Sequence, residues 1–251
     1  MHALRELMAG NFPEAVKGFE RELALTPDDI AIADGLSKAL QGAGDYRRAL
    51  PYMECVHSYQ KANNPDAPGQ LLPMACAHWY LDEREKALGL VRELCASMLE
   101  GAISMAPDQA GGATFGLVLH YMGITAGDDQ NRDYALDYLR ALNAKYDKRP
   151  TLFRYPVQTV KQILGELSFE DALEGATKER SLPAAYQIAK SNRMALGELG
   201  IALFHDGVLR RASGDEAGCM ERMQQVFKLG YQTESMRWQL ARHEVLYARL
   251  H

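Results

Sequence analysis

Cysteine and histidine are the residue types in this chain that could support nucleophilic or metal chemistry. The four cysteines lie far apart and form no CxxC pair: Cys55, Cys76, Cys95 and Cys219. A zinc ribbon needs closely spaced ligand pairs, and a nucleophilic cysteine needs a base beside it in the folded chain. This spacing is typical of reduced thiols buried between the helices of a cytosolic protein. An enzyme with a Cys–His pair stays open as an alternative, because the fold could bring one of seven histidines to a thiol.

The other candidates for chemistry each lack a partner at the required spacing. Cys76 and His78 are two residues apart on a predicted helix and therefore point in different directions. His243 and Glu244 are followed by no histidine at the metalloprotease distance, and the glycine pairs precede no Gly-Lys-Ser/Thr loop. We therefore predict no catalytic residue, no metal site and no cofactor.

Histidines and paired carboxylates have structural interpretations. His120 and His205 lie in apolar stretches, which favours packing histidines over acid–base groups. Three carboxylate pairs lie at predicted helix starts or turns: Asp28-Asp29, Asp82-Glu83 and Asp128-Asp129. Negative charge at a helix start stabilises the positive end of the helix dipole, so these pairs need no catalytic role.

Composition narrows the class of protein. Hydrophobic residues make up 47% of the 251 residues and charged residues 24%, as in soluble globular proteins. A formal charge of −5 argues against nucleic acid as a partner, because phosphate binding needs a basic face. The sequence has no run of about 18 apolar residues and no export signal at its N-terminus, so we predict a cytoplasmic protein without a membrane span.

An internal repeat is visible at the N-terminus. Gly10, Phe12, Ala15 and Phe19 recur 34 residues later as Gly44, Tyr46, Ala49 and Met53. A glycine can end a first helix at a tight turn, an aromatic side chain fills the elbow, and a small alanine lets the second helix approach the first. A period of 34 residues resembles that of the tetratricopeptide family, and Pro27 completes the family pattern in the first unit.

This resemblance to tetratricopeptide repeats, of the small stand-alone bacterial type, implies an all-α fold. We expect a right-handed α-solenoid of about six helical hairpins with a C-terminal capping helix. Packing positions later in the chain are Ala87, Ala135, Ala172 and Cys219, and the wider spacing between them indicates insertions between hairpins. The prediction is one domain over residues 1–251: two regular repeats over 1–62, degenerate repeats over 63–232 and a capping helix over 233–251.

Individual helices follow from the same pattern. Beyond the two regular repeats, the sequence predicts helices over 71–81, 85–99, 112–126, 133–146, 156–165, 191–212, 216–228 and 233–250, with a short helix from Phe169. Connections are expected at 63–68 and 101–111.

Binding residues follow from the resemblance, which implies that the first helices of the hairpins line a concave groove. The positions that this alignment selects for partner binding are Asp34, Lys38, Gln41, Leu72, Trp79, Tyr80, His120 and Tyr121. Trp79 and Tyr80 would form an aromatic hot spot if they are partly exposed. The alternative is that Trp79 packs between neighbouring hairpins.

The predicted function is therefore non-catalytic binding of a protein partner through a concave helical surface. The stretches Asp108–Gly112 and Leu117–Tyr121 resemble stand-alone bacterial repeat proteins, some of which neutralise toxins, so a toxin or effector is one expected partner of an immunity protein. The alternative is a scaffold or secretion chaperone that binds components of a larger assembly. Leu4 and Gly35 stand where a clamp for chaperone tails has asparagines, which argues against that subclass.

Overall fold

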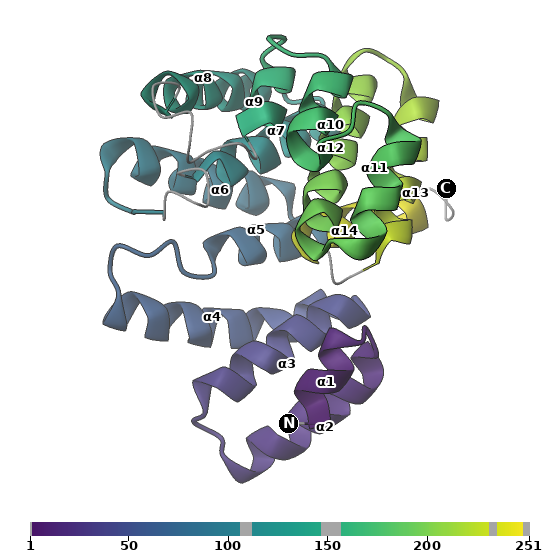
Figure 1. Cartoon of the computed structure of the whole chain (residues 1–251). Coiled ribbons are helices and arrows are strands. Elements are labelled where there is room, and N and C mark those ends of the chain that lie inside the picture. Colours follow the sequence, from purple (N-terminus) through teal and green to yellow (C-terminus); the bar gives the residue numbers. More distant parts are fainter. Residues whose placement is uncertain (1, 106–111, 147–156, 231–234, 248–251) are drawn as a thin grey trace. The chain divides into compact units, whose positions relative to one another are not determined.

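The computed structural model describes residues 2–105, 112–146, 157–230 and 235–247, and all the elements assigned within these ranges are α-helices (Figure 1). This confirms the all-α class. The chain divides into two compact units, unit 1 (Met1–Ile103) and unit 2 (Ser104–His251). The single continuous domain that the sequence predicts stays a prediction. Pro156 and most of the predicted connection over 101–111 lie outside the described residues.

Unit 1 consists of three helical hairpins. Its helices are α1 (His2–Met8), α2 (Phe12–Leu25), α3 (Ile30–Ala43), α4 (Tyr46–Asn63), α5 (Leu71–Tyr80) and α6 (Arg84–Glu100). Each of these helices packs on the next along the chain, as the purple to blue ribbons of Figure 1 show. The predicted hairpins and their 34-residue spacing are confirmed here.

The turn inside each hairpin of unit 1 has the same backbone geometry. Gly10, Gly44 and Asp82 have φ values of 77°, 85° and 61°. The following residue then donates its N–H to a carbonyl five residues earlier, at 2.9 Å in all three hairpins. This hydrogen bond closes the end of the first helix, as in a Schellman motif. Asp82 thus takes the left-handed position of the glycine that the third hairpin lacks, since aspartate tolerates this conformation better than most residues.

Two glycines of α3 allow α2 to pack closely. A Cβ atom on Gly42 would lie 2.2 Å from the Phe12 ring, and one on Gly35 would lie 2.5 Å from Phe19. Only a residue without a side chain fits such contacts. Ala15 and Ala49, the predicted packing alanines, are both fully buried. The elbow aromatics and small residues therefore act as the sequence predicts.

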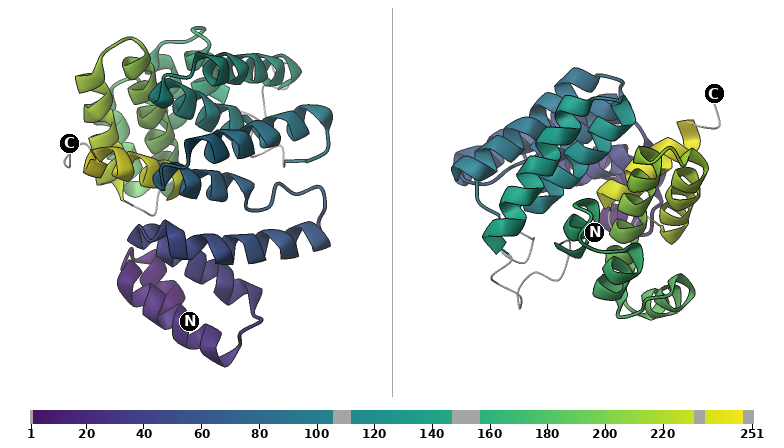
Figure 2. Two further views of the ribbon diagram at one scale, coloured as in Figure 1. Left: turned by 180° about the vertical axis from the view of Figure 1, so that it is seen from behind. Right: turned by 90° about the horizontal axis from the view of Figure 1, so that it is seen from above.

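Unit 2 is arranged around one long helix. Its helices are α7 (Ala113–Ala126), α8 (Asp129–Tyr146), α9 (Val157–Ile163), α10 (Phe169–Thr177), α11 (Leu182–Ser191), α12 (Arg193–Ala212), α13 (Glu216–Leu229) and α14 (Ser235–Tyr247). The central helix α12 packs against α7, α9, α10, α11, α13 and α14. The two views of Figure 2 show α11 to α13 (green to yellow-green) and α14 (yellow) grouped together.

Several predicted boundaries in unit 2 are wrong. The sequence predicts no helix over 182–191, yet α11 forms there because Ser181 accepts the N–H of Ala184 and Pro183 lies in the first turn. Asn192 then accepts the N–H groups of Met194 and Ala195, at 3.0 and 3.1 Å, so α12 starts as a new helix. Helix α8 begins at Asp129, four residues before the predicted start.

The first helix of each hairpin is more buried than the second. In α7, every residue from Phe115 to Gly123 is buried, whereas α8 alternates buried and exposed positions. Helices α3 and α5 show the same bias toward burial relative to α4 and α6. The helices expected to line an exposed groove therefore form much of the apolar core of their units.

Candidate functional site

A surface pocket of about 470 Å³ lies in unit 1 between the start of α3 and the second half of α4. We call it the Asp34 pocket. Its lining residues are Asp28, Asp29, Ile30, Ala31, Asp34, Val56, Tyr59 and Gln60. Three of these eight side chains are aspartates and none is basic, so the pocket favours a positively charged ligand.

The turn between α2 and α3 positions the acidic rim of the Asp34 pocket. Helix α2 ends where the Thr26 hydroxyl donates a hydrogen bond to the carbonyl of Glu22. The N–H of Asp29 donates to the carbonyl of Thr26 at 3.1 Å. The Asp29 carboxylate accepts the N–H groups of Ala31 and Ile32 at 2.9 and 3.2 Å, which caps α3. The Asp29 carboxylate is therefore used to cap α3, and the neighbouring residue Asp28 is exposed.

Asp34 lies about one turn further along α3, and only one of its two carboxylate oxygens has a hydrogen-bond partner among the described residues. Its Oδ2 accepts a hydrogen bond from Lys38 Nζ. Its Oδ1 is buried and has no hydrogen-bond partner within the described ranges. A buried acceptor without a partner costs free energy, roughly 1–3 kcal/mol, and a donor from a ligand would recover it. Asp34 can therefore bind an ammonium or guanidinium group that enters the pocket.

Helix α4 supplies the less polar wall of the pocket. Tyr59 is 52% exposed although it is a large aromatic residue, and Val56 below it is buried. Gln60 is held by Gln70, whose Nε2 lies 3.4 Å from its Oε1. An aromatic ring beside carboxylates can bind a lysine or arginine side chain, because the ring contacts its aliphatic part and the carboxylates contact its charged group.

The structure brings only two of the predicted binding residues to this pocket. Asp34 lines it, and Lys38 is exposed and paired with Asp34. Gln41 and Leu72 are both only 9% exposed. The side-chain amide of Gln41 donates to the carbonyl of Ser37 in its own helix. Neither residue presents a surface to a partner.

A hot spot of Trp79 and Tyr80 requires partial exposure of both rings, and Trp79 does not meet this condition. Trp79 is 2% exposed, and the guanidinium of Arg84 lies 4.3 Å from its ring centroid. Tyr80 is half-buried and stacks on Tyr46 with 4.1 Å between ring centroids. The Tyr80 ring thus packs between the second and third hairpins, and Trp79 is buried and contacts Arg84 of its own hairpin.

His120 and Tyr121 also fail as surface residues, because α7 is a core helix. His120 is 3% exposed and Tyr121 is fully buried. Burial lowers the pKa of His120 to about 4, and the charge of Arg132 acts in the same direction. The Tyr121 hydroxyl donates to Glu244 of α14 at 2.8 Å. Both side chains serve the interior of unit 2.

Sequence reasoning missed Asp28 and Tyr59. Asp28 was interpreted only as a helix-start charge, and Tyr59 lies on a second helix, outside the positions that the family alignment selects. Tyr59 lies on the exposed polar face of α4. A large aromatic residue on such a face can be recognised from the sequence and indicates a candidate binding surface.

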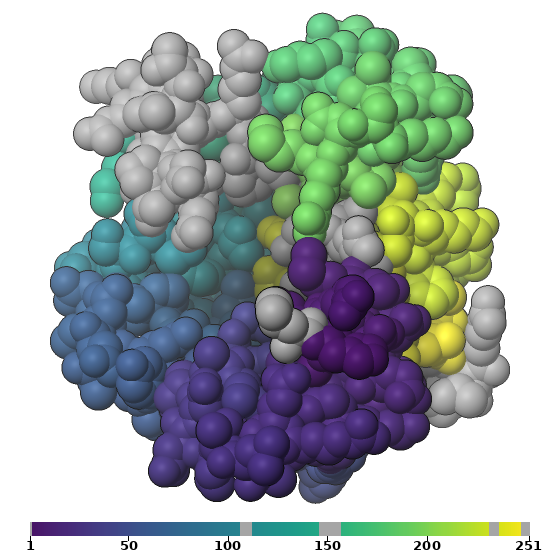
Figure 3. Space-filling model, turned by 60° about the horizontal axis from the view of Figure 1, so that its bottom comes forward, coloured from purple at the N-terminus to yellow at the C-terminus, as the bar shows by residue number. Residues whose placement is uncertain are grey.

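A second exposed patch lies on α1. Leu4 and Met8, one turn apart, are 52% and 50% exposed. Figure 3 shows the darkest purple residues of the N-terminus at the surface of the face it presents. Two apolar side chains without a pocket or a fixed polar group are common on protein surfaces. The Asp34 pocket is the better candidate site.

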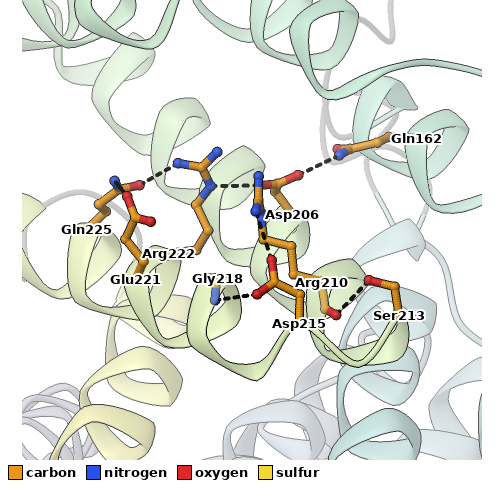
Figure 4. Close-up of polar contacts among 9 residues, drawn as sticks. All are labelled: Gln162, Asp206, Arg210, Ser213, Asp215, Gly218, Glu221, Arg222 and Gln225. Atoms are coloured by element: carbon orange, nitrogen blue, oxygen red, sulfur yellow. Dashed lines mark hydrogen bonds and ion pairs between the residues drawn. The ribbon is translucent and has the colours of Figure 1, made fainter.

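A buried polar network in unit 2 has a structural explanation. The Oδ2 atom of Asp206 accepts from Arg210 Nε at 2.9 Å and from Arg222 Nε at 2.6 Å, while Gln162 approaches Oδ1 at 3.4 Å (Figure 4). Arg210 also bonds Asp215, the cap of α13. Two guanidiniums and two carboxylates balance in charge, so the network joins α9, α12 and α13 without a vacant charge for a ligand.

Cys95 and Cys219 do not have the properties of nucleophiles. Burial raises the pKa of Cys219 to about 12 and raises that of Cys95 further. A catalytic cysteine needs the opposite shift. Cys55 is exposed, so the prediction that all four thiols are buried is wrong at that position. Within the described ranges, no group of three or more histidine, cysteine, aspartate or glutamate side chains could hold a metal ion.

Membrane insertion finds no support in the described helices, none of which combines the length and the apolar character that a span requires.

Comparisons with known proteins give little beyond the fold. No protein-family model and no curated protein matches the chain. Among solved structures, the chain is similar to a tetratricopeptide repeat protein from Parabacteroides merdae, with 12% identity, a TM-score of 0.41 and 96% of each chain covered. A likeness this distant supports no argument about function. The features that this chain shares with tetratricopeptide repeats are its helical hairpins, the 34-residue spacing in unit 1 and the left-handed elbow turns.

Proposed function

We propose that the chain is a non-catalytic protein-binding module that takes a basic segment of its partner into the Asp34 pocket. The observation that carries this proposal is the buried Oδ1 of Asp34, which lacks a hydrogen-bond partner within the described ranges and lies in a pocket with two further aspartates. A lysine or arginine of the partner would supply the missing donor.

The exposed ring of Tyr59 supports the same class of ligand. A basic side chain brings an apolar stem along with its charge, and the stem can lie against the ring while the charge reaches Asp34. Charge complementarity of this kind speeds association and weakens as salt is added. Binding should therefore fall steeply with ionic strength.

Two biological roles fit such a module. A cytoplasmic bacterial immunity protein would neutralise one toxin through a single tight complex. A scaffold or secretion chaperone would bind several components, each through an extended basic segment. The exposed Tyr59 at the rim of the pocket suits an extended segment lying along α4. Recovery of one stoichiometric partner would favour the immunity role, and recovery of several weak partners would favour the scaffold.

The binding mode can be tested without a known partner. A random peptide library displayed on phage is selected against the full chain, and the enriched peptides are synthesised and titrated by fluorescence anisotropy. We expect enrichment of lysine or arginine beside an apolar residue. The Asp28→Asn/Asp34→Asn double variant should weaken binding roughly tenfold or more, because it removes the two carboxylates that are not used for capping.

Two further variants sharpen this test. Lys38→Met frees the Oδ2 atom of Asp34 and should strengthen binding of the same peptide. Glu93→Gln removes an exposed carboxylate on α6, away from the pocket lining, and serves as the matched control with no expected effect. Acidic or purely apolar peptides, or equal affinity for the chain and the double variant, would show that the pocket does not bind a basic segment.

A further inference from the structure

Helix α14 is anchored in unit 2 by polar contacts, most of them with little exposure to solvent. Arg237 Nε donates to Nε2 of His205 in α12 at 3.1 Å, and these residues are 2% and 0% exposed. Glu244 accepts two hydrogen bonds from Arg211 of α12, both 3.0 Å. Trp238 Nε1 donates to the carbonyl of Phe227 in α13 at 3.0 Å. One of these anchors of α14 therefore depends on a histidine that accepts a hydrogen bond.

The His205–Arg237 contact requires neutral imidazole. A guanidinium has donors only, so Nε2 of His205 must supply a lone pair and the ring proton must be on Nδ1. That Nδ1 is buried and has no hydrogen-bond partner among the described residues. A second proton would occupy the accepting nitrogen and place two cations against one another. Protonation of His205 thus removes this anchor and replaces it with repulsion.

The described groups around His205 offer no compensation for a second proton. The charged or titratable groups that act on its ring are Arg237 of α14 and His120 of α7, and both disfavour protonation. Arg132 of α8 acts in the same way on His120, whose Nδ1 is likewise buried without a hydrogen-bond partner.

The nearby carboxylates already have partners. Asp206, next to His205 in the chain, binds Arg210 and Arg222. Glu244 is taken by Arg211 and by the hydroxyl of Tyr121 in α7. Among the described residues, the charged groups that act on the two imidazoles are Arg132, Arg237 and His120, so acid adds positive charge beside positive charge.

We propose that α14 is a pH-sensitive cap, which leaves α12 on mild acidification before the rest of unit 2 unfolds. The contacts that join α12 to α13 through Asp206 contain no histidine, so protonation of His205 does not remove them directly. Departure of α14 removes the ring of Trp238 from that of Phe227, now 5.6 Å apart, and uncovers apolar surface on α13. Acid would thereby expose a surface that is covered at neutral pH.

Tryptophan fluorescence tests this directly, because the chain has two tryptophans and one of them is Trp238 on α14. In the full-length Trp79→Phe variant, acrylamide quenching and emission wavelength are followed as pH falls, with far-UV circular dichroism in parallel. We expect quenching of Trp238 to rise as the pH falls below 6.5, the ordinary pKa of histidine, while most of the helical signal remains. Simultaneous loss of both signals would mean general acid unfolding and would overturn the proposal.

Variants identify the responsible group. His205→Gln keeps an acceptor for Arg237 but cannot be protonated, so the fluorescence transition should shift down by at least about one pH unit. His57→Gln changes a half-buried histidine of unit 1 and should leave the transition unchanged. Identical transitions in His205→Gln and the parent would refute the role of His205. Should Trp79→Phe fail to fold, ¹⁹F NMR of the 5-fluorotryptophan-labelled chain, with Trp238→Phe for assignment, reads the same outcomes.

Discussion

Mild acidification should also destabilise unit 2 through His120, a buried histidine of α7. The ring is 3% exposed, and burial lowers its pKa from the ordinary value of 6.5 to about 4. Because the unfolded chain then binds a proton more readily than the folded chain, this histidine contributes full stability above about pH 6.5. That contribution is lost as pH falls toward 4 and is gone below it.

The size of the effect follows from the difference in pKa. Each unit corresponds to about 1.4 kcal/mol, so complete protonation costs folding about 3 kcal/mol, and about 2 kcal/mol of this is already lost at pH 5. This is a large share of the 5–15 kcal/mol, roughly, that holds a typical domain folded.

Urea denaturation of the wild type and of His120→Gln at a series of pH values isolates this contribution. The variant is expected to be less stable at neutral pH, because the buried ring no longer packs. The difference in free energy of unfolding between the two proteins should shrink by about 2 kcal/mol between pH 7 and pH 5. A difference that stays constant with pH would refute the argument that burial keeps His120 neutral.

Three other perturbations test the packing described above. An aromatic disulfide reagent should modify one of the four thiols quickly in the native chain, that of exposed Cys55, and Cys55→Ser should abolish the fast phase; rapid modification of two or more thiols would contradict the burial of the others. Asp206→Ala should cost about 3–5 kcal/mol in thermal or urea unfolding, since it leaves two guanidiniums without their shared carboxylate; a loss under 1 kcal/mol or so would mean that solvent replaces it. Gly42→Ala should lower the free energy of unfolding by about 1–3 kcal/mol, because the Phe12 ring must move. Asp82→Gly should leave it unchanged or raise it by up to about 1 kcal/mol. A lower melting temperature for Asp82→Gly than for Gly42→Ala would refute the assignment of the elbow turns.

Local repeats were predictable because their causes are local. A glycine at a helix end, an aromatic two residues later and an alanine three further on each respond to contacts within one hairpin, so Gly44, Tyr46 and Ala49 revealed the fold. Helix α11 was missed because its start depends on Ser181 and Pro183 in a stretch without a repeat pattern.

The candidate site was harder to predict because exposure is a property of the assembled hairpins. The family alignment placed the binding surface on the first helices, but these are the most apolar helices and are buried. The residue type of Trp79 left both exposure and burial open, and the structure buries it with Arg84 near its ring. The alignment selected Asp34, but its oxygen without a hydrogen-bond partner could not be inferred from residue types.

In the proposed complex, Asp34 receives a positive charge from a protein partner. A double-mutant cycle tests this pairing: Asp34→Asn is combined with replacement of each lysine or arginine of the bound segment by alanine, and affinities are measured by isothermal titration calorimetry. One basic residue is expected to couple to Asp34 by about 1–3 kcal/mol. Coupling energies near zero for every basic residue would show that no such pairing forms.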